Sequence, residues 1–257
     1  MKVVILAGGL GTRISEESHL KPKPMIEIGG MPILWHIMKY YSEFGFNEFI
    51  ICLGYKQYMV KEFFVDYPLH TSNFTLDMKT GNMETLNKTT EDWKVTLVDT
   101  GLETMTGGRL KKIKDYIDGD TFMLTYGDGV ADVDLNKLLE FHKAHNTLLT
   151  ITTVSISNQK GVLNINDNGI IDSFREKQKD DEALINGGFM VCNKKVIDYI
   201  AGDDTSFEKE PIAKLVSEKQ VAAYNHTGFW QCMDTQREMK LLCELWDEGK
   251  APWKIWK

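Results

Sequence analysis

The part of the sequence that most constrains the fold is the N-terminus, where a short apolar run leads directly into a glycine-rich loop. Residues 3–7 (Val-Val-Ile-Leu-Ala) have the length and β-branched character of a strand buried on both faces of a parallel sheet. The loop after this strand therefore lies at the carboxyl edge of the sheet. Because open α/β sheets bind their ligands at that edge, the same stretch predicts a fold class and a binding site.

The loop itself indicates an anionic ligand. Gly8, Gly9 and Gly11 leave backbone N–H groups accessible, and such groups attract phosphates. Three cations follow closely: Arg13, Lys21 and Lys23. Neither of two familiar glycine loops fits. Ile14 stands where the dinucleotide fingerprint needs its third glycine or alanine, and the Gly-Lys-Ser/Thr of the P-loop does not occur in this loop.

Alternating strand and helix patterns predict an α/β protein with a Rossmann-like, mostly parallel sheet flanked by helices, as one large domain or one with a small appendage. Further strands are expected over residues 48–54, 95–99, 121–126, 148–154, 162–166, 170–175 and 185–192. Helices are expected from Pro32, over 56–64, from Thr106, and over 135–145, 194–200 and 207–218. Residues 70–94 break the pattern and predict an insertion or a small strand pair over the edge of the sheet.

Composition excludes several classes of function. The net charge of −7 argues against broad nucleic-acid binding, which needs a basic face. The four cysteines show no CxxC spacing, and the first apolar stretch ends at Gly8, too short for a signal-peptide core or a membrane span. We therefore expect reduced thiols in a cytoplasmic protein that does not enter a membrane.

Two aspartates are candidate metal ligands. Asp128 lies between two glycines directly after an apolar strand, and Asp234 follows an apolar run and precedes a helix. Two carboxylates from the two halves of the chain could share Mg²⁺, which prefers a few protein oxygens together with phosphate oxygens and water. The alternatives are that Asp128 forms a turn and that Asp234 is an ordinary helix N-cap.

Two further groups of residues are candidate ligand contacts. Arg109 lies just inside a helix, where a cation opposes the helix dipole, so an anionic ligand nearby would explain its position. Glu176 and Lys177 end one strand, and Asn186 and Gly187 belong to another. These four residues could receive sugar hydroxyls and a phosphate, or could be solvated strand ends and a turn.

Other polar and aromatic residues have structural interpretations. His142 and His145 share a helical face that is more typical of a surface than of a metal site, and His36 and His226 are expected to be structural or exposed. The C-terminal tail carries Trp246, Trp253 and Trp256, which predicts packing against the body of the protein or a neighbouring subunit.

Taken together, these residues resemble the sugar-1-phosphate nucleotidyltransferase family, whose signature is a strand, GGxGTR and a Lys-Pro element. Here the signature reads Gly8-Gly9-Leu10-Gly11-Thr12-Arg13 and Lys21-Pro-Lys23-Pro. Within the family the chain looks most like the members that join CTP to glucose 1-phosphate. The matching stretches are Val98-Asp-Thr-Gly, Met105-Thr-Gly-Gly-Arg-Leu-Lys, Thr125-Tyr-Gly-Asp-Gly-Val-Ala-Asp, Ile185-Asn-Gly-Gly-Phe, Gly228-Phe-Trp-Gln and Gly249-Lys-Ala-Pro-Trp-Lys.

The resemblance implies a GT-A-like single domain over residues 1–257, with a nucleotide-binding half to about residue 130, then a sugar-phosphate half with a small β subregion and a helical tail. It implies CTP, a sugar 1-phosphate and Mg²⁺ as ligands, a homo-oligomer, and a CDP-sugar product for deoxysugar or O-antigen lipopolysaccharide synthesis. Nucleotide contacts would be Leu6, Ala7, Gly8, Gly9, Leu10, Gly11, Thr12, Arg13, Lys23, Thr104 and Arg109. Lys23, Arg13 and Asp128 would be catalytic, Asp128 and Asp234 would hold the metal, and Glu176, Lys177, Asn186 and Gly187 would bind the sugar phosphate.

Three positions depart from the family pattern: Lys160, Gln178 and Cys232. All three lie in the sugar-binding half or beside the second metal ligand, so they affect the expected sugar more than the expected chemistry. Two alternatives stay open. One is a transferase for another sugar phosphate or nucleotide, and the other is a catalytically silent nucleotide- or sugar-binding regulator.

Overall fold

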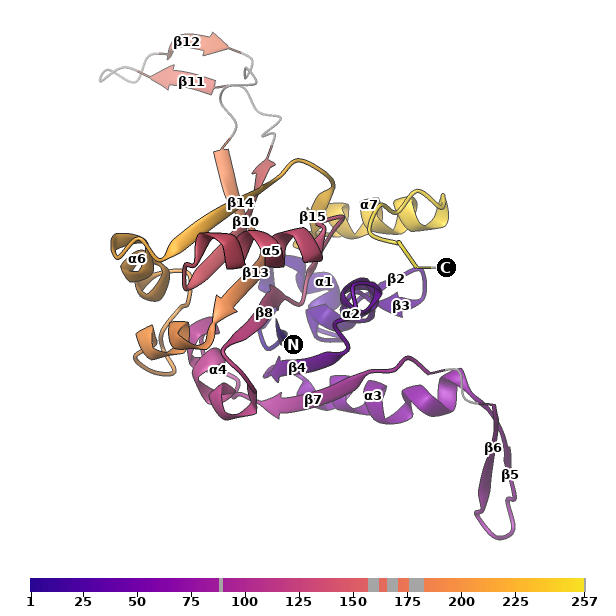
Figure 1. Ribbon diagram of the computed structural model, residues 1–257. Coiled ribbons are helices and arrows are strands. Elements are labelled where there is room, and N and C mark those ends of the chain that lie inside the picture. The colour runs from indigo at the N-terminus through magenta and orange to yellow at the C-terminus, as the bar shows by residue number, and fades with distance from the viewer. Residues whose placement is uncertain (88–89, 157–161, 166–170, 176–182, 257) are drawn as a thin grey trace.

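A seven-stranded sheet forms the centre of the computed structural model, which describes residues 1–87, 90–156, 162–165, 171–175 and 183–256 (Figure 1). The strand order is β14-β10-β13-β8-β1-β4-β7. Strand β13 is antiparallel to both of its neighbours, and all other pairings in this sheet are parallel. The bounds are β1 Lys2–Leu6, β4 Glu48–Leu53, β7 Lys94–Asp99, β8 Thr121–Tyr126, β10 Leu149–Ile156, β13 Ala183–Asn193 and β14 Val221–His226.

The first strand is buried on both faces, as its sequence predicts. Val3 and Ile5 belong to one hydrophobic cluster, and Val4 and Leu6 belong to the other, because side chains alternate along a strand. Edge strand β14 is not predicted, because it is a half-exposed strand whose sequence, Val-Ala-Ala-Tyr-Asn-His, has no continuous run of large apolar residues. The mostly parallel α/β sheet is confirmed.

Helices cover both faces of the sheet. The hydrophobic cluster that contains Val3 and Ile5 includes residues of α2 (Ile33–Glu43), α3 (Gln57–Thr71), α5 (Leu135–His145) and α7 (Gln236–Asp247). The cluster that contains Val4 and Leu6 includes residues of α4 (Thr106–Lys112), η5 (Lys194–Tyr199) and α6 (Glu210–Ser217). Shorter elements are η1 (Thr12–Ile14), α1 (Ser15–Ser18), η2 (Lys23–Met25), η3 (Lys114–Tyr116), and the strand pairs β2 (Glu27–Ile28) with β3 (Met31–Pro32) and β9 (Gly129–Ala131) with β15 (Trp230–Cys232).

The C-terminal tail packs against the body of the protein through its tryptophans. Trp253 is fully buried, and the ring of Trp246 meets the ring of His36 edge-on at 4.6 Å between centroids. His36 is itself buried, and its Nε2 lies 2.8 Å from the carbonyl oxygen of Ile28. Burial lowers the pKa of His36 to about 4. The structural interpretations of this histidine and of the tail are confirmed.

Residues in the 70–94 insertion form the predicted strand pair, β5 (Asn73–Leu76) and β6 (Met83–Asn87). The expected position over the edge of the sheet is wrong, because the hairpin projects beyond α3 with all residues of both strands exposed (Figure 1). A second antiparallel pair, β11 (Val162–Ile165) and β12 (Ile171–Arg175), extends beyond the ends of β10 and β13 at another side of the molecule (Figure 1).

The two other histidine expectations have different outcomes. The surface interpretation is wrong for His142, which is buried with Nδ1 2.8 Å from the Thr150 hydroxyl, whereas His145 is exposed. His226 is structural, with Nε2 2.9 Å from Asp132 Oδ1. Within the part of the chain that the structure describes, no helix is long and apolar enough to cross a membrane.

Candidate active site

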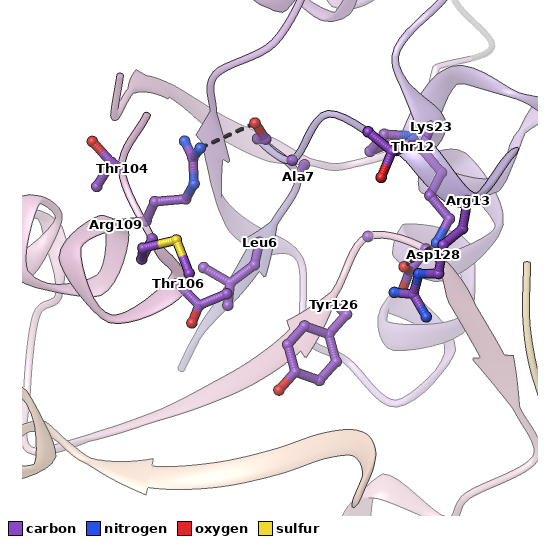
Figure 2. A pocket seen from close by; sticks show the side chains of 16 residues that line it. Leu6, Ala7, Thr12, Arg13, Lys23, Thr104, Thr106, Arg109, Tyr126 and Asp128 are labelled. Atoms are coloured by element: carbon purple, nitrogen blue, oxygen red, sulfur yellow. Dashed lines mark hydrogen bonds and ion pairs between the residues drawn. The ribbon is translucent and has the colours of Figure 1, made fainter. Parts of the chain in front are cut away.

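Arg109 holds together the loops at the carboxyl ends of β1, β4 and β7. Its guanidinium donates to the carbonyl oxygens of Gly8 at 3.0 Å, Leu53 at 3.0 Å and Gly101 at 2.8 Å, and to the Thr100 hydroxyl at 2.6 Å. A Cβ at Gly8 would lie 2.2 Å from this guanidinium, so a side chain there would push the guanidinium out of these bonds. The structure thus places Arg109 in the wall of the site (Figure 2), where its guanidinium donates hydrogen bonds to the carbonyl oxygens of the loops.

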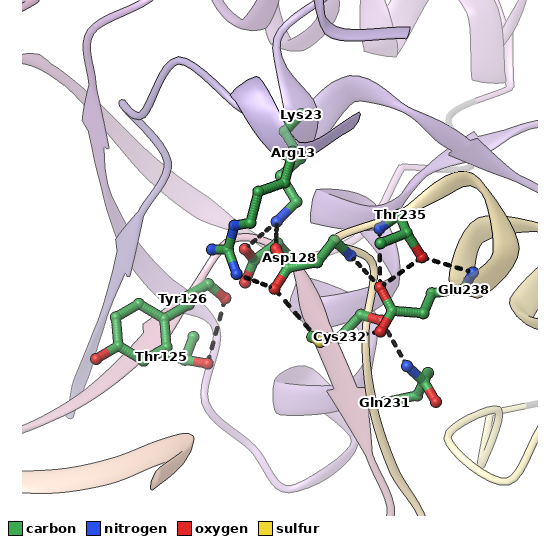
Figure 3. Close-up of polar contacts among 10 residues, drawn as sticks. Arg13, Lys23, Thr125, Tyr126, Asp128, Gln231, Cys232, Thr235 and Glu238 are labelled. Carbon is green, nitrogen blue, oxygen red and sulfur yellow. Dashed lines mark hydrogen bonds and ion pairs between the residues drawn. The ribbon is translucent and has the colours of Figure 1, made fainter. Parts of the chain in front are cut away.

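A cluster of two cations and two carboxylates forms the centre of the site (Figure 3). Lys23 Nζ donates to Asp128 Oδ2 at 2.5 Å and also to Asp234 Oδ1. Arg13 pairs with Asp234 Oδ2 at 2.5 Å, although its side chain is 74% exposed. Burial alone would lower the pKa of Lys23, but the two carboxylates outweigh burial and raise that pKa above its ordinary value. The lysine is therefore a fixed positive charge.

Strand ends bring the two aspartates together from distant parts of the sequence. Asp128 occupies the turn between β8 and β9, and Asp234 follows β15, which pairs with β9. The backbone N–H of Met233 donates to the carbonyl oxygen of Asp128 at 2.8 Å and fixes the two segments. The N-cap alternative for Asp234 is wrong, because Thr235 caps α7 in a capping box with Glu238. The turn alternative for Asp128 holds alongside its contact with Lys23.

The two carboxylates fit the hard cation expected from the sequence. Both lie within hydrogen-bond reach of one ammonium group, so their oxygens can meet around a single small cation. Among the described residues, no group of three or more His, Cys, Asp or Glu side chains is placed to hold a metal. Two protein oxygens, completed by phosphate oxygens and water, are a set that Mg²⁺ typically accepts.

Two pockets meet at this cluster. The first, of about 370 Å³, is lined by the predicted nucleotide contacts Leu6, Ala7, Gly8, Gly9, Gly11, Thr12, Arg13, Lys23, Thr104 and Arg109. The second, of about 550 Å³, is lined by Asn186 and Gly187 together with Asp234. Arg13, Tyr126 and Asp128 line both pockets. Figure 2 shows Arg109 and Thr104 at one end of the first pocket and Lys23 and Asp128 at the other.

Among the described sequence candidates, Leu10 alone is not placed in these walls. Leu10 is exposed and does not line either pocket. Glu176 and Lys177 lie outside the described residues, as do the two variant positions Lys160 and Gln178. Arg13 differs from Lys23 in being mostly exposed, so it has room to move toward a ligand.

Sequence reasoning missed several residues of the second pocket. Tyr126 and Trp230 could have been found, since both lie in stretches that match the family, but Glu208 carries no sequence signal. Trp230 Nε1 donates to the carbonyl oxygen of Gly187 at 2.7 Å and fixes one wall. The variant residue Cys232 has its Sγ 3.7 Å from Asp234 Oδ2, and burial raises the pKa of this thiol to about 12. It is therefore a neutral neighbour of the carboxylate cluster.

Comparison with known proteins gives consistent similarities. The family model described as nucleotidyl transferase matches residues 2–235. The chain is 54% identical over 258 residues to glucose-1-phosphate cytidylyltransferase of Salmonella typhimurium (strain LT2), and 44% identical over 257 residues to a probable glucose-1-phosphate cytidylyltransferase of Bacillus subtilis (strain 168). Both matches cover 100% of each chain. The crystal structure of HddC from Yersinia pseudotuberculosis is similar with a TM-score of 0.68 at 27% identity, covering 95% of this chain and 99% of that one.

Proposed function

The chain belongs to the nucleotidyl transferase family, and from this premise we propose that it transfers the cytidylyl group of CTP to α-D-glucose 1-phosphate, giving CDP-glucose and pyrophosphate. The observation that carries the proposal is the meeting of two pockets at one cluster of Lys23, Arg13, Asp128 and Asp234. One pocket has the glycine loop that suits a nucleoside triphosphate, and the other has the amide and bare backbone that suit a sugar phosphate. A transferase needs both, with the reacting groups at the junction.

The reaction is an in-line attack of a sugar-phosphate oxygen on the α-phosphorus of CTP, with pyrophosphate leaving. The nucleophile is already an anion, so the protein has to position two polyanions that repel each other and to stabilise the charge that develops. Lys23 can exchange carboxylate oxygens for phosphate oxygens without leaving its place in the wall of the first pocket. Arg13, exposed at the rim, can turn onto the departing pyrophosphate.

Asp128 and Asp234 would hold Mg²⁺, and the ion would supply charge neutralisation at the phosphate oxygens. Among the chain's own residues, Arg109 holds the glycine loop through its bond to Gly8. It would therefore affect nucleotide binding both by fixing the loop and by lining the pocket. From the family resemblance of the sequence we further propose a homo-oligomer and a product that feeds deoxysugar and O-antigen lipopolysaccharide synthesis.

The test is pyrophosphate release in the presence of Mg²⁺, crossing CTP, UTP, dTTP and ATP with glucose 1-phosphate and other sugar 1-phosphates. A reaction without sugar phosphate controls for nucleotide hydrolysis. Turnover confined to CTP and glucose 1-phosphate is the expected result, and it would show that Lys160, Gln178 and Cys232 are tolerated variations. Turnover with another pair of nucleotide and sugar phosphate would mean that the proposed mechanism holds but the proposed substrates are wrong. No turnover with any pair would favour the silent regulator, which the intact catalytic cluster argues against.

A further inference from the structure

A chain of hydrogen bonds outside the cluster of Lys23, Arg13, Asp128 and Asp234 connects the two pockets through Glu208. One carboxylate oxygen of Glu208 accepts from the Tyr126 hydroxyl at 2.7 Å. The other accepts from the Thr106 hydroxyl at 2.5 Å and from the Ser206 hydroxyl at 2.8 Å. Thr106 lines the first pocket, Glu208 lines the second, and Tyr126 lines both. The carboxylate therefore stands at the link between the two binding sites.

The turn that carries Glu208 is held firmly although the glutamate itself is exposed. Its neighbour Phe207 is fully buried, and the backbone N–H of Phe207 donates to the Thr106 hydroxyl oxygen at 2.9 Å. The N–H of Gly107 donates to the carbonyl oxygen of Thr205 at 2.9 Å. These bonds tie the turn to the first residues of α4, so the position of the carboxylate relative to the pockets is fixed by the backbone.

The hydrogen bonds also fix the direction in which each group points. A phenol has one proton, and Tyr126 commits that proton to Glu208. Its oxygen is then left to accept from Asn186 Nδ2, which lies 3.3 Å away. The side-chain oxygen of Asn186 in turn accepts from the backbone N–H of Gly188 at 2.8 Å. The Asn186 amide in the second pocket is therefore held from two sides, by the Gly188 backbone and by the Tyr126 oxygen that Glu208 orients.

Tyr126 has little freedom to find another arrangement. A Cβ at position 188 would lie 2.6 Å from the Tyr126 ring, so the ring rests directly on the backbone of Gly188. With the ring fixed there, the phenol can only turn its hydroxyl hydrogen from one neighbour to another.

We propose that Glu208 is a positioning residue for the acceptor substrate. Its carboxylate orients Tyr126, and Tyr126 orients the Asn186 amide that receives the sugar phosphate. This inference rests on the proposed function, since it assigns the second pocket to the sugar phosphate. Glu208 itself is placed to act through Tyr126 and Asn186.

The first experiment compares steady-state kinetics of the full-length protein and Glu208→Gln. Glutamine keeps the size of the side chain but replaces one acceptor oxygen with an N–H₂ donor, so the three hydroxyls can no longer all donate. We expect KM for glucose 1-phosphate to rise about tenfold, the effect of losing roughly one hydrogen bond. KM for CTP should stay within about twofold, because Thr106 keeps its bond to the backbone of Phe207. Glu210→Gln, which alters an acid without contacts to either pocket, is the matched control.

A double-mutant cycle with Tyr126→Phe separates this link from general damage. If Glu208 acts through the phenol, the double variant should raise KM for glucose 1-phosphate no further than Tyr126→Phe alone. Additive effects, equal rises in both KM values, or an unchanged KM in Glu208→Gln would overturn the inference. Wild-type turnover with the CTP and glucose 1-phosphate pair is read in the same assay. If the wild type instead prefers another sugar phosphate, the proposed specificity fails, and the same comparison with that substrate still tests Glu208.

Discussion

Lys23 is a buried cation whose only described side-chain partners are the two aspartates expected to bind metal. Removing it should leave Asp128 without its cation and Asp234 with only the exposed Arg13, and should take a cation from the transition state. We predict that Lys23→Ala lowers kcat by about a hundredfold or more, as loss of a charged transition-state contact commonly does. Pyrophosphate release measures the effect, with Lys137→Ala on the exposed surface of α5 as the control. Activity within a few-fold of wild type would refute this role.

The expected role of Asp234 as a metal ligand can be tested by measuring how much Mg²⁺ the activity needs. Asn at position 234 keeps the shape of the side chain but removes its charge, so the site should attract a divalent cation less strongly. We predict that Asp234→Asn raises the Mg²⁺ concentration for half-maximal activity by at least about tenfold, a loss that even outer-shell metal contacts cause. A Mg²⁺ titration of pyrophosphate release measures it. An unchanged half-saturation would remove Asp234 from the metal site.

Single residues also show where sequence reasoning ends. Glycines in the loop after β1 predict a ligand, and Gly9 does face open space. At Gly8, however, a side chain would also collide with the Arg109 guanidinium, and this contact joins residues far apart in the sequence. The same holds for Glu208, whose partners Tyr126 and Thr106 come from other elements. Local patterns predict the residue types of a site, but only the fold shows which of them touch.

At the scale of elements, the first turn of α4 packs so closely against the 203–207 turn that it needs glycine at position 107. A Cβ at Gly107 would lie 2.6 Å from the Thr205 carbonyl oxygen, a backbone atom that cannot move aside easily. Helix propensity favours alanine over glycine by up to about 1 kcal/mol. Overpacking against backbone typically costs about 1–3 kcal/mol, so the contact should dominate. We predict that Gly107→Ala lowers the free energy of unfolding in urea.

Gly202→Ala is the matched control for this prediction, because nothing lies within 4 Å of a Cβ at position 202 and its φ is not in the left-handed range. It should change the free energy of unfolding by less than about 0.5 kcal/mol. A stabilised Gly107→Ala would mean that α4 and the 203–207 turn separate easily, which would also weaken the argument for Glu208.

For the molecule as a whole, buried strands are the part that the sequence predicts best. Continuous apolar runs locate β1, β4 and β8, because burial on both faces leaves little choice of side chain. The antiparallel direction of β13 and the edge strand β14 are not predicted, since direction and edge pairing depend on long-range contacts. The projecting β5–β6 hairpin is predicted as a strand pair but not in its position, because no apolar pattern attaches it to the sheet.

The docked C-terminal tail gives the whole molecule a predictable response to acid. His36 lies against Trp246 and Trp253, and burial lowers its pKa from 6.5 to about 4. The unfolded chain therefore binds a proton on this histidine between pH 6.5 and pH 4, whereas the folded protein does not. The contribution of His36 to the free energy of unfolding must then fall as the pH drops through this window, and it levels off below pH 4. The shift corresponds to about 3 kcal/mol.

Urea unfolding at a series of pH values measures this contribution as the difference between the wild type and His36→Gln, at one fixed protein concentration. Other groups titrate in both proteins and cancel in the difference, so the wild type should lose up to about 3 kcal/mol more than the variant between pH 6.5 and pH 4. His70→Gln, at an exposed position on α3, should keep the wild-type slope. Parallel curves for wild type and His36→Gln would mean that the tail opens and hydrates His36 before the body unfolds. In that case the tail is a separately unfolding segment rather than part of the cooperative core.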